Sequence, residues 1–229
     1  MGKGIDIKDY LTQGWEMFSA NMTNLIVANL ILVVISLAVN IIPFGGLVVA
    51  GPLMGGMFYI LLDLNAGEPF NVKRLFDGFT TKIVPLILAG IVIQILVIIG
   101  SIFLLIPGIL VFGWYLLTYL YIVDRDMDFW PAMEASRGVA FENQLGMFLL
   151  ALALIVVNIL GVLALGVGVL VTMPVTYCTV FKVYKDQVGL VDDPANRTGA
   201  AGKVMDNKPK MKITPPPPPP APEKGKGKK

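Results

Sequence analysis

Alternating carboxylates are the residues in this sequence whose types and spacing come closest to a chemical site. Asp124, Asp126 and Asp128 stand in the run DRDMD, and acidic residues at every second position open the calcium loop of EF-hands. That loop also needs a central glycine and a closing glutamate at its twelfth position, and neither follows here. A plainer interpretation is a polar exit from one helix, with Asp128 near the start of the next, where a carboxylate suits the helix dipole. We therefore expect no metal site in this run.

Carboxylates could also serve lipid chemistry at a membrane surface. Phosphatidyl-transfer enzymes use a spaced aspartate array with glycine and arginine companions, and this chain has no such array. P-loop, GxSxG, HExxH and CxxC patterns are also missing. Histidine, the commonest general base, does not occur, and Cys178 is the only cysteine, so no intrachain disulfide can form. The sequence predicts no catalytic residue, no cofactor and no metal site. The carboxylates in question are Asp63, Asp77, Asp124, Asp126, Asp128 and Glu134.

The elements that would position these residues are long and apolar. Leu25–Leu64 contains one charged residue, Asp63, Ile83–Val123 contains none, and Met147–Val183 contains one, Lys182. Each block is about twice the ~20 residues that an α-helix needs to cross a bilayer. We therefore predict an all-α, polytopic membrane protein in which each block forms a hairpin of two transmembrane helices.

Proline and glycine near the middle of each block predict the turns. Residues 43–46 and 106–108 contain both residue types, and glycines between 161 and 168 turn the third hairpin. Helices of about 17–20 residues cover roughly 26–30 Å, which only just spans a typical bilayer core. The predicted spans are residues 25–42, 47–64, 83–105, 109–123, 147–165 and 167–183.

Lysine and arginine residues decide the predicted orientation. All 18 lie in the N-terminal segment, in the two longer connections between hairpins, or in the region from Lys182 onward, and the three short turns hold none. Because positively charged segments remain in the cytoplasm, we expect both termini and both longer connections there. Acidic residues precede the first apolar run, so we expect the first span to act as an uncleaved insertion signal.

A short amphipathic segment precedes each hairpin, with apolar residues at helical spacing and most charged residues off that stripe. Phe18, Phe79 and Phe141 mark the three segments at intervals of 61 and 62 residues. Three copies of one unit, an interfacial helix followed by a hairpin, would explain the spacing, and chance is the alternative. The stripes are Ile7, Tyr10, Leu11, Gly14, Trp15 and Phe18; Val72, Leu75, Phe76 and Phe79; and Trp130, Met133, Arg137, Phe141 and Leu145.

Polar groups inside the apolar blocks are few, and none at mid-membrane is ionisable, which disfavours a proton-coupled carrier. We expect hydrogen bonds between helices, worth about 0.6 kcal/mol each on average. The small residues of Gly51–Gly56, with Gly90 and Gly100, are typical of close helix packing, either within the chain or in a homo-oligomer. The polar residues are Asn29, Asn40, Gln94, Thr118, Asn158, Thr172 and Thr176.

The end of the chain has a different composition. After a membrane domain of residues 1–187, we predict a disordered, cytoplasmic, proline- and lysine-rich tail at 188–229. Lys203–Lys229 holds eight lysines against two acidic residues, and Pro215–Pro220 favours an extended polyproline stretch. Three interpretations of the tail are open. It is simply a solvated segment, it tethers to anionic lipids at roughly 1 kcal/mol per lysine near the surface, or it recruits an acidic protein. Nucleic acid is not expected, because arginine and aromatic support are missing.

Short motifs beside the helix ends carry a family resemblance. They are Leu75–Phe79, Ile106–Ile109, Asp124, and then Ala132, Ala135 and Ser136. On these residues, Gly14–Tyr184 resembles the YciC-like proteins and the membrane domain attached to some glycerophosphoryl diester phosphodiesterases. The resemblance implies a six-helix domain in a prokaryotic cytoplasmic membrane and brings no settled activity. The phosphodiesterase of those proteins is a separate soluble barrel for which this chain has no room, so its activity is not carried over.

These features predict a non-enzymatic membrane scaffold or accessory protein that organises lipids or partner proteins at the cytoplasmic face. A carrier or channel for an apolar or lipid-like molecule is the first alternative, and a cavity lined by small polar residues would favour it. A lipid-modifying enzyme that uses cytoplasmic-face carboxylates is the second. A cluster of Asp77 with Asp124, Asp126 and Asp128 would favour the enzyme.

Overall fold

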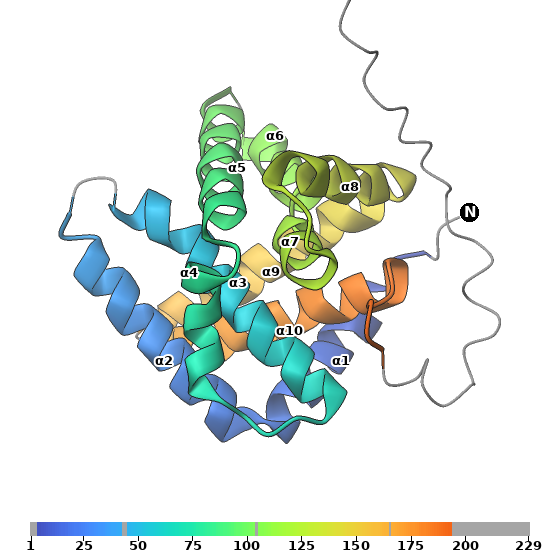
Figure 1. Cartoon of the computed structure of the whole chain (residues 1–229). Coiled ribbons are helices and arrows are strands. Elements are labelled where there is room, and N and C mark those ends of the chain that lie inside the picture. Colours follow the sequence, from blue (N-terminus) through green and yellow to red (C-terminus); the bar gives the residue numbers. More distant parts are fainter. Residues whose placement is uncertain (1–3, 43–44, 104, 165, 194–229) are drawn as a thin grey trace, which may run out of the picture. The chain divides into compact units, whose positions relative to one another are not determined.

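A computed structural model describes residues 4–42, 45–103, 105–164 and 166–193, and within these residues all regular structure is helical (Figure 1). This confirms the predicted all-α class for the described part of the chain. The predicted tail from residue 194 onward lies outside it. The elements are α1 (Ile7–Ala20), α2 (Met22–Val39), α3 (Gly45–Ala66), the 3₁₀-helix η1 (Val72–Phe76), α4 (Asp77–Thr80), α5 (Ile83–Phe103), α6 (Leu105–Trp114), α7 (Thr118–Arg125), α8 (Phe129–Glu142), α9 (Gln144–Leu163) and α10 (Val169–Gln187).

Long apolar helices indicate an integral multi-pass membrane protein. Five segments of the described chain are long and apolar enough to cross a bilayer. The predicted sixth span, now α10, does not meet the same standard, because any 18 consecutive residues of it contain Lys182, Lys185 and Asp186. The five candidate spans are Met22–Val39, Gly45–Ala66, Ile83–Ile102, Ile106–Arg125 and Gln144–Leu163.

Consecutive long helices pack in pairs, α2 with α3, α5 with α6, and α9 with α10. Figure 1 shows α5 and α6 side by side, and α3 packs along α5 to join the first pair to the second. Glycine permits the closest crossings. A Cβ on Gly51 would overlap the carbonyl oxygen of Leu86, and one on Gly56 would overlap that of Leu75. The small residues of α3 therefore serve packing within the chain, the first of the two predicted alternatives.

The fourth predicted span, 109–123, is not one continuous helix. The chain breaks between Trp114 at the end of α6 and Thr118 at the start of α7. Ser136 of α8 satisfies the backbone at the break, because its hydroxyl donates to the Trp114 carbonyl oxygen (2.7 Å) and accepts from the Leu117 amide (3.2 Å). A buried hydroxyl from a distant helix thus replaces two helical hydrogen bonds, which local hydropathy does not reveal.

Residues 106–108, the predicted turn between the third and fourth spans, lie within α6. α5 ends at Phe103 and α6 begins at Leu105, so Pro107 stands in the first turn of α6. The first amides of a helix have no helical acceptor, and a proline there sacrifices no hydrogen bond. Proline therefore begins this helix, whereas we expected it to interrupt one.

Each of the three predicted amphipathic stripes is buried only in part: Phe18, Leu75 and Met133 are buried, whereas Trp15, Phe76 and Trp130 are exposed. α1 buries Tyr10, Gly14 and Phe18. α8 leaves Trp130 and Phe141 exposed and buries a face of mostly small residues. Small side chains let α8 approach α7 and carry Ser136 to the helix break. The buried face of α8 consists of Ala132, Met133, Ala135, Ser136 and Ala140.

The packed unit continues past residue 187, where we placed the domain boundary. Leu190 is buried, and the Val191 amide donates to the Asp124 carboxylate at 3.3 Å. Gly189 takes a positive φ of 79°, a conformation that glycine adopts without strain, and it ends α10. The residues up to Asp193 thus belong with the helices.

Candidate functional site at the charged end of the helices

Side-chain contacts join the charged segments that the sequence separates. Four links connect α1, the C-terminal ends of α3, α7 and α10, and the residues just before α5, and we call this group of elements the charged end. The convergence agrees with the one-sided charge pattern. The links are Tyr10 to Asp186 (2.5 Å), Lys185 to Asn65 (3.1 Å), Arg125 to Tyr184 (3.1 Å) and Lys82 to Asp126 (2.6 Å).

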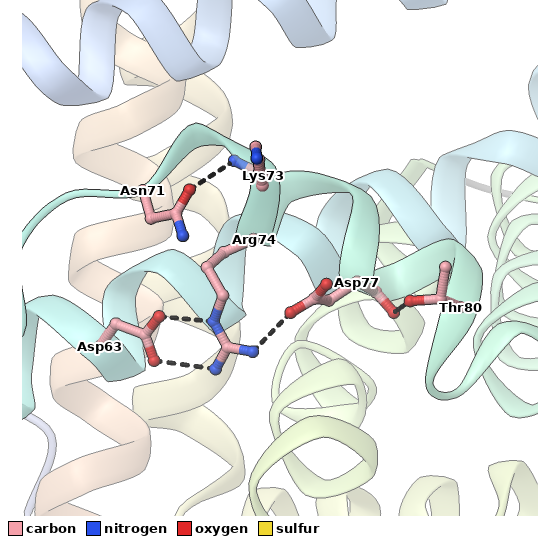
Figure 2. A network of polar contacts seen from close by, with 6 residues as sticks. All are labelled: Asp63, Asn71, Lys73, Arg74, Asp77 and Thr80. Atoms are coloured by element: carbon pink, nitrogen blue, oxygen red, sulfur yellow. Dashed lines mark hydrogen bonds and ion pairs between the residues drawn. The ribbon is translucent and has the colours of Figure 1, made fainter.

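Arg74 forms the most complete polar cluster of the charged end (Figure 2). Its Nε and Nη2 donate to the two oxygens of Asp63 at 2.5 and 2.9 Å, and its Nη1 donates to Asp77 at 2.5 Å. The guanidinium also lies 5.2 Å from the ring centre of Tyr59, a cation–π distance. These groups come from α3, η1 and α4, so one arginine ties the end of α3 to the connection that follows it.

Local sequence holds this arginine in place. Asn71 caps η1 by accepting a hydrogen bond from the Lys73 amide at 3.0 Å, and Asp77 opens α4. The paired carboxylate of Asp63 raises the pKa of Arg74 above its ordinary value, with Asp77 adding to the effect, although partial burial opposes it. The guanidinium therefore stays charged, and its two partners leave it no fork with which to hold a phosphate.

A second cluster closes the end of α10. The Tyr184 hydroxyl donates to Asp124 (3.0 Å) and accepts from Arg125 Nε (3.1 Å). Arg125 Nη2 also donates to the carbonyl oxygens of Val188 (3.2 Å) and Gly189 (3.0 Å), which lie just past the helix. The two residues at the end of α7 thus fix where the chain leaves α10.

A third cluster joins α1 to α10. Tyr10 donates to Asp186 at 2.5 Å and accepts from the Gln187 side-chain amide at 3.0 Å. Burial, together with the hydrogen bond to Asp186, raises the pKa of Tyr10 to about 12. The phenol therefore remains a neutral hydrogen-bond donor at physiological pH.

The structure disperses the carboxylates that the sequence singled out. Asp124 faces Tyr184, and Asp126 pairs with Lys82. Asp128 lies near the start of α8, as predicted, and takes its N-cap position in an extended conformation, although its side chain makes no capping hydrogen bond. Asp77 pairs with Arg74. Within the described residues, no group of three or more His, Cys, Asp or Glu could hold a metal ion.

Exposed aromatic rings mark the predicted interfacial segments, and all four rings belong to the stripes predicted from the sequence. Among the side chains whose burial the structure describes, the exposed aromatics belong to α1, η1 or α8. Basic residues stand nearby: Lys8 lines a shallow depression with Trp15, and Arg137 lies 5.9 Å from the ring centre of Phe141. Aromatic rings with basic neighbours are typical of the bilayer interface. The rings and their exposed fractions are Trp15 (49%), Phe76 (46%), Trp130 (56%) and Phe141 (51%).

Polar residues inside the apolar helices form some of the predicted interhelical bonds. Asn158 of α9 donates to Thr176 of α10 at 2.7 Å, and Asn29 of α2 donates to the Val169 carbonyl oxygen at 3.3 Å. Asn40 instead bonds within its own chain segment, to the Ser36 carbonyl oxygen at 2.7 Å. The Thr118 and Thr172 hydroxyls are buried without a hydrogen-bond partner among the described residues. The prediction therefore holds for two asparagines and fails for these threonines.

The motifs behind the family resemblance have packing roles. A Cβ on Gly78 would overlap the carbonyl oxygen of Pro52, so the Leu75–Phe79 motif needs its glycine to lie against α3. Ser136 supports the break between α6 and α7. Comparisons of the chain with protein-family models, with curated proteins and with solved structures found no match.

Proposed function

We propose that this chain is a non-enzymatic membrane scaffold that organises anionic lipids or partner proteins at the cytoplasmic face. The charged end carries this proposal. Asp63 and Asp77 pair with Arg74, Asp126 pairs with Lys82 and Asp124 accepts from Tyr184, which favours a rigid platform over a reactive site. Exposed rings with basic neighbours on α1 and α8 give that platform a surface suited to lipid head groups.

The topology that we propose has six spans in three hairpins, with α10 as the sixth and with both termini in the cytoplasm of a prokaryote. The contacts of α10 support it. Its first thirteen residues, Val169–Phe181, carry no charge, and its charged residues lie where α10 meets Asn65 and Tyr10 at the charged end. An even number of crossings returns the chain to that end. The same topology fits membership in the six-helix family that the motifs resemble.

The basic tail supplies the recruiting element of this proposal. Lys203–Lys229 lies C-terminal to the platform in the sequence and combines eight lysines with a polyproline stretch. Several lysines near an anionic surface together give useful affinity, at roughly 1 kcal/mol each. A partner protein with acidic groups would bind to the same lysines.

Affinity purification from native membranes tests the scaffold. The full chain is compared with a form lacking residues 203–229 and with a control that keeps the length of the tail but has glutamine at its eight lysines. We expect the full chain to retain anionic lipids or a partner protein that both altered forms lose. The proposal fails if the full chain retains no partner and no lipid beyond the bulk membrane composition.

A carrier for a lipid-like molecule is the second candidate, and one observation favours it. A groove between α2, α3 and α5 is lined partly by uncharged polar side chains. Flux of a lipid probe across proteoliposomes that contain the full chain would support the carrier. Retention of lipid without flux would support the scaffold.

A further inference from the structure

A groove of about 550 Å³ lies between α2, α3 and α5. Figure 1 shows the first half of α3 between the other two helices. α2 supplies Ser36, and Asn40 follows directly on that helix; α3 supplies Leu53, and α5 supplies Gln94 and Ile98. The volume falls within the range of about 300–1,000 Å³ that small-molecule sites occupy.

The position of these residues sets the depth of the groove. Ser36 and Asn40 stand near the C-terminal end of α2, which is the end remote from the charged N-terminal segment. Gln94 stands near the middle of α5, roughly 16 Å along the helix from Ile83. The groove therefore extends from the uncharged ends of the helices to about the middle of the bilayer.

Several hydrogen-bonding groups in the groove have no partner among the described residues. The Gln94 amide and the Ser36 hydroxyl make no hydrogen bond to any described residue. The Asn40 amide nitrogen bonds the Ser36 carbonyl oxygen, and its own side-chain oxygen is left as an acceptor. Unpaired polar groups are costly in hydrocarbon, where water does not satisfy them. A ligand that offers hydrogen bonds next to an apolar chain would remove this cost.

Charge and volume argue against two other occupants. The described residues of the lining carry no charge, so none of them compensates a phosphate or an ammonium drawn to mid-membrane depth. A helix from a second copy is about 10–12 Å wide, and each of its turns fills roughly 400–600 Å³. The groove has space for about one such turn, far less than a spanning helix needs.

We propose that this groove binds a neutral lipid with a small uncharged head, of the diacylglycerol class. One acyl chain lies along Leu53 and Ile98, and the ester and hydroxyl groups bond to Gln94 and Ser36. Only an uncharged head sinks to the depth of Gln94, so the site discriminates against phospholipids. The inference is independent of the scaffold proposal, because no residue of the charged end takes part.

Photolabelling in nanodiscs tests this site. The full-length protein is exposed to a diacylglycerol with a photoreactive acyl chain, in competition with unlabelled diacylglycerol or with an anionic phospholipid. We expect labels on α2, α3 and α5 that only the neutral lipid displaces. Gln94→Leu should weaken binding about five- to tenfold, the effect of one lost hydrogen bond. Gln144→Leu, which removes an exposed amide at the start of α9, should leave binding unchanged.

Two further measurements test whether weaker labelling reflects lost lipid binding and whether the site is separate from the scaffold. Thermal unfolding should show Gln94→Leu to be at least as stable as the parent protein, because it removes an unpaired amide, so weaker labelling will not reflect misfolding. Deleting residues 203–229 should not change labelling, which separates this site from the scaffold. Unchanged labelling of Gln94→Leu, or equal displacement by the phospholipid, would overturn the proposal. So would efficient disulfide crosslinking between copies that carry Gln94→Cys, since a second copy would then fill the groove.

Discussion

Single side chains at the charged end connect elements that the chain order keeps apart. Arg74 is the clearest case, because its planar fork engages both oxygens of Asp63 and still reaches Asp77. Only a guanidinium offers this geometry, since an ammonium is a point charge without fixed donors. The side chain is partly exposed, so solvent screens its ion pairs and the hydrogen-bond geometry carries much of the effect.

Replacing Arg74 with methionine should lower the free energy of unfolding by about 1–3 kcal/mol, because it leaves two carboxylates facing each other without donors. Arg74→Lys should recover less than half of the loss. Lys73→Ala, at an exposed neighbouring position, is the matched control and should change stability little. Thermal unfolding in detergent measures all three. Full rescue by lysine would show that charge alone matters at this position.

Removing the Ser136 hydroxyl should also cost about 1–3 kcal/mol, because the Trp114 carbonyl and the Leu117 amide would remain buried and unpaired. Ser19→Ala, which removes an exposed hydroxyl bonded within α1, serves as the control. Hydrogen exchange should show faster opening of residues 114–118 in Ser136→Ala alone. Equal protection in both variants would contradict the role that we assign to Ser136.

Ionisation of Tyr10 should lower the free energy of unfolding at high pH. Because its folded pKa is raised from 10.0 to about 12, the neutral phenol is favoured in the folded state. Its contribution is therefore complete below pH 10 and is lost as the pH rises from 10 to 12. The stability difference between the parent protein and Tyr10→Phe should shrink across this window, as followed by chemical unfolding. A difference that stays constant across the window would rule out this linkage.

At the scale of elements, backbone contact between helices decides the packing. α3 touches α5 at Gly51 and η1 at Gly56, and in both places the neighbour is a main-chain carbonyl that cannot rotate away. Overpacking of this kind forces backbone shifts. At a helical glycine with open space around it, substitution by alanine should instead stabilise the protein, since alanine favours helix more than glycine does.

Gly56→Ala should therefore destabilise the protein by about 1–3 kcal/mol and displace η1 from α3. Gly138→Ala should stabilise it by up to about 1 kcal/mol, because nothing lies within 4 Å of an added Cβ on this exposed face of α8. The two substitutions make the same chemical change, so thermal unfolding compares their surroundings directly. Similar effects of both would argue against the α3–η1 contact.

At the scale of the whole molecule, the topology that we propose places the turn and the open end of each hairpin on opposite sides of the membrane. Cys178 is buried and is the only cysteine, so its replacement by alanine gives a background for labelling. Cysteines at Ile41 and Val167 should react only from the non-cytoplasmic side, because both residues are exposed at uncharged turns. A cysteine at Lys73 should react only from the cytoplasm. Labelling of all three from one side would exclude the spanning topology.

Local properties could be predicted from the sequence because they are sums over neighbouring residues. Hydropathy over some twenty residues identified five of the candidate spans, and the α1 stripe followed from helical periodicity with Tyr10 and Phe18 on one face. The uneven distribution of lysine and arginine predicted that the charged segments lie together at one end of the helices. Side-chain contacts connect these segments in the structure. Each segment by itself must be long enough to cross the bilayer or must bury one face of its helix.

Only the tertiary structure decided which residues meet. On α8 the conspicuous aromatics face outward and the small residues inward, because close approach to α7 excludes large rings. The break after Trp114 depends on a hydroxyl 22 positions later, and the Arg74 cluster on a carboxylate one helix earlier. The acidic run at 124–128 reads as one group along the chain, yet its carboxylates face different elements. Such contacts depend on the tertiary fold, which brings distant segments together. Composition and periodicity describe only neighbouring residues and do not specify these contacts.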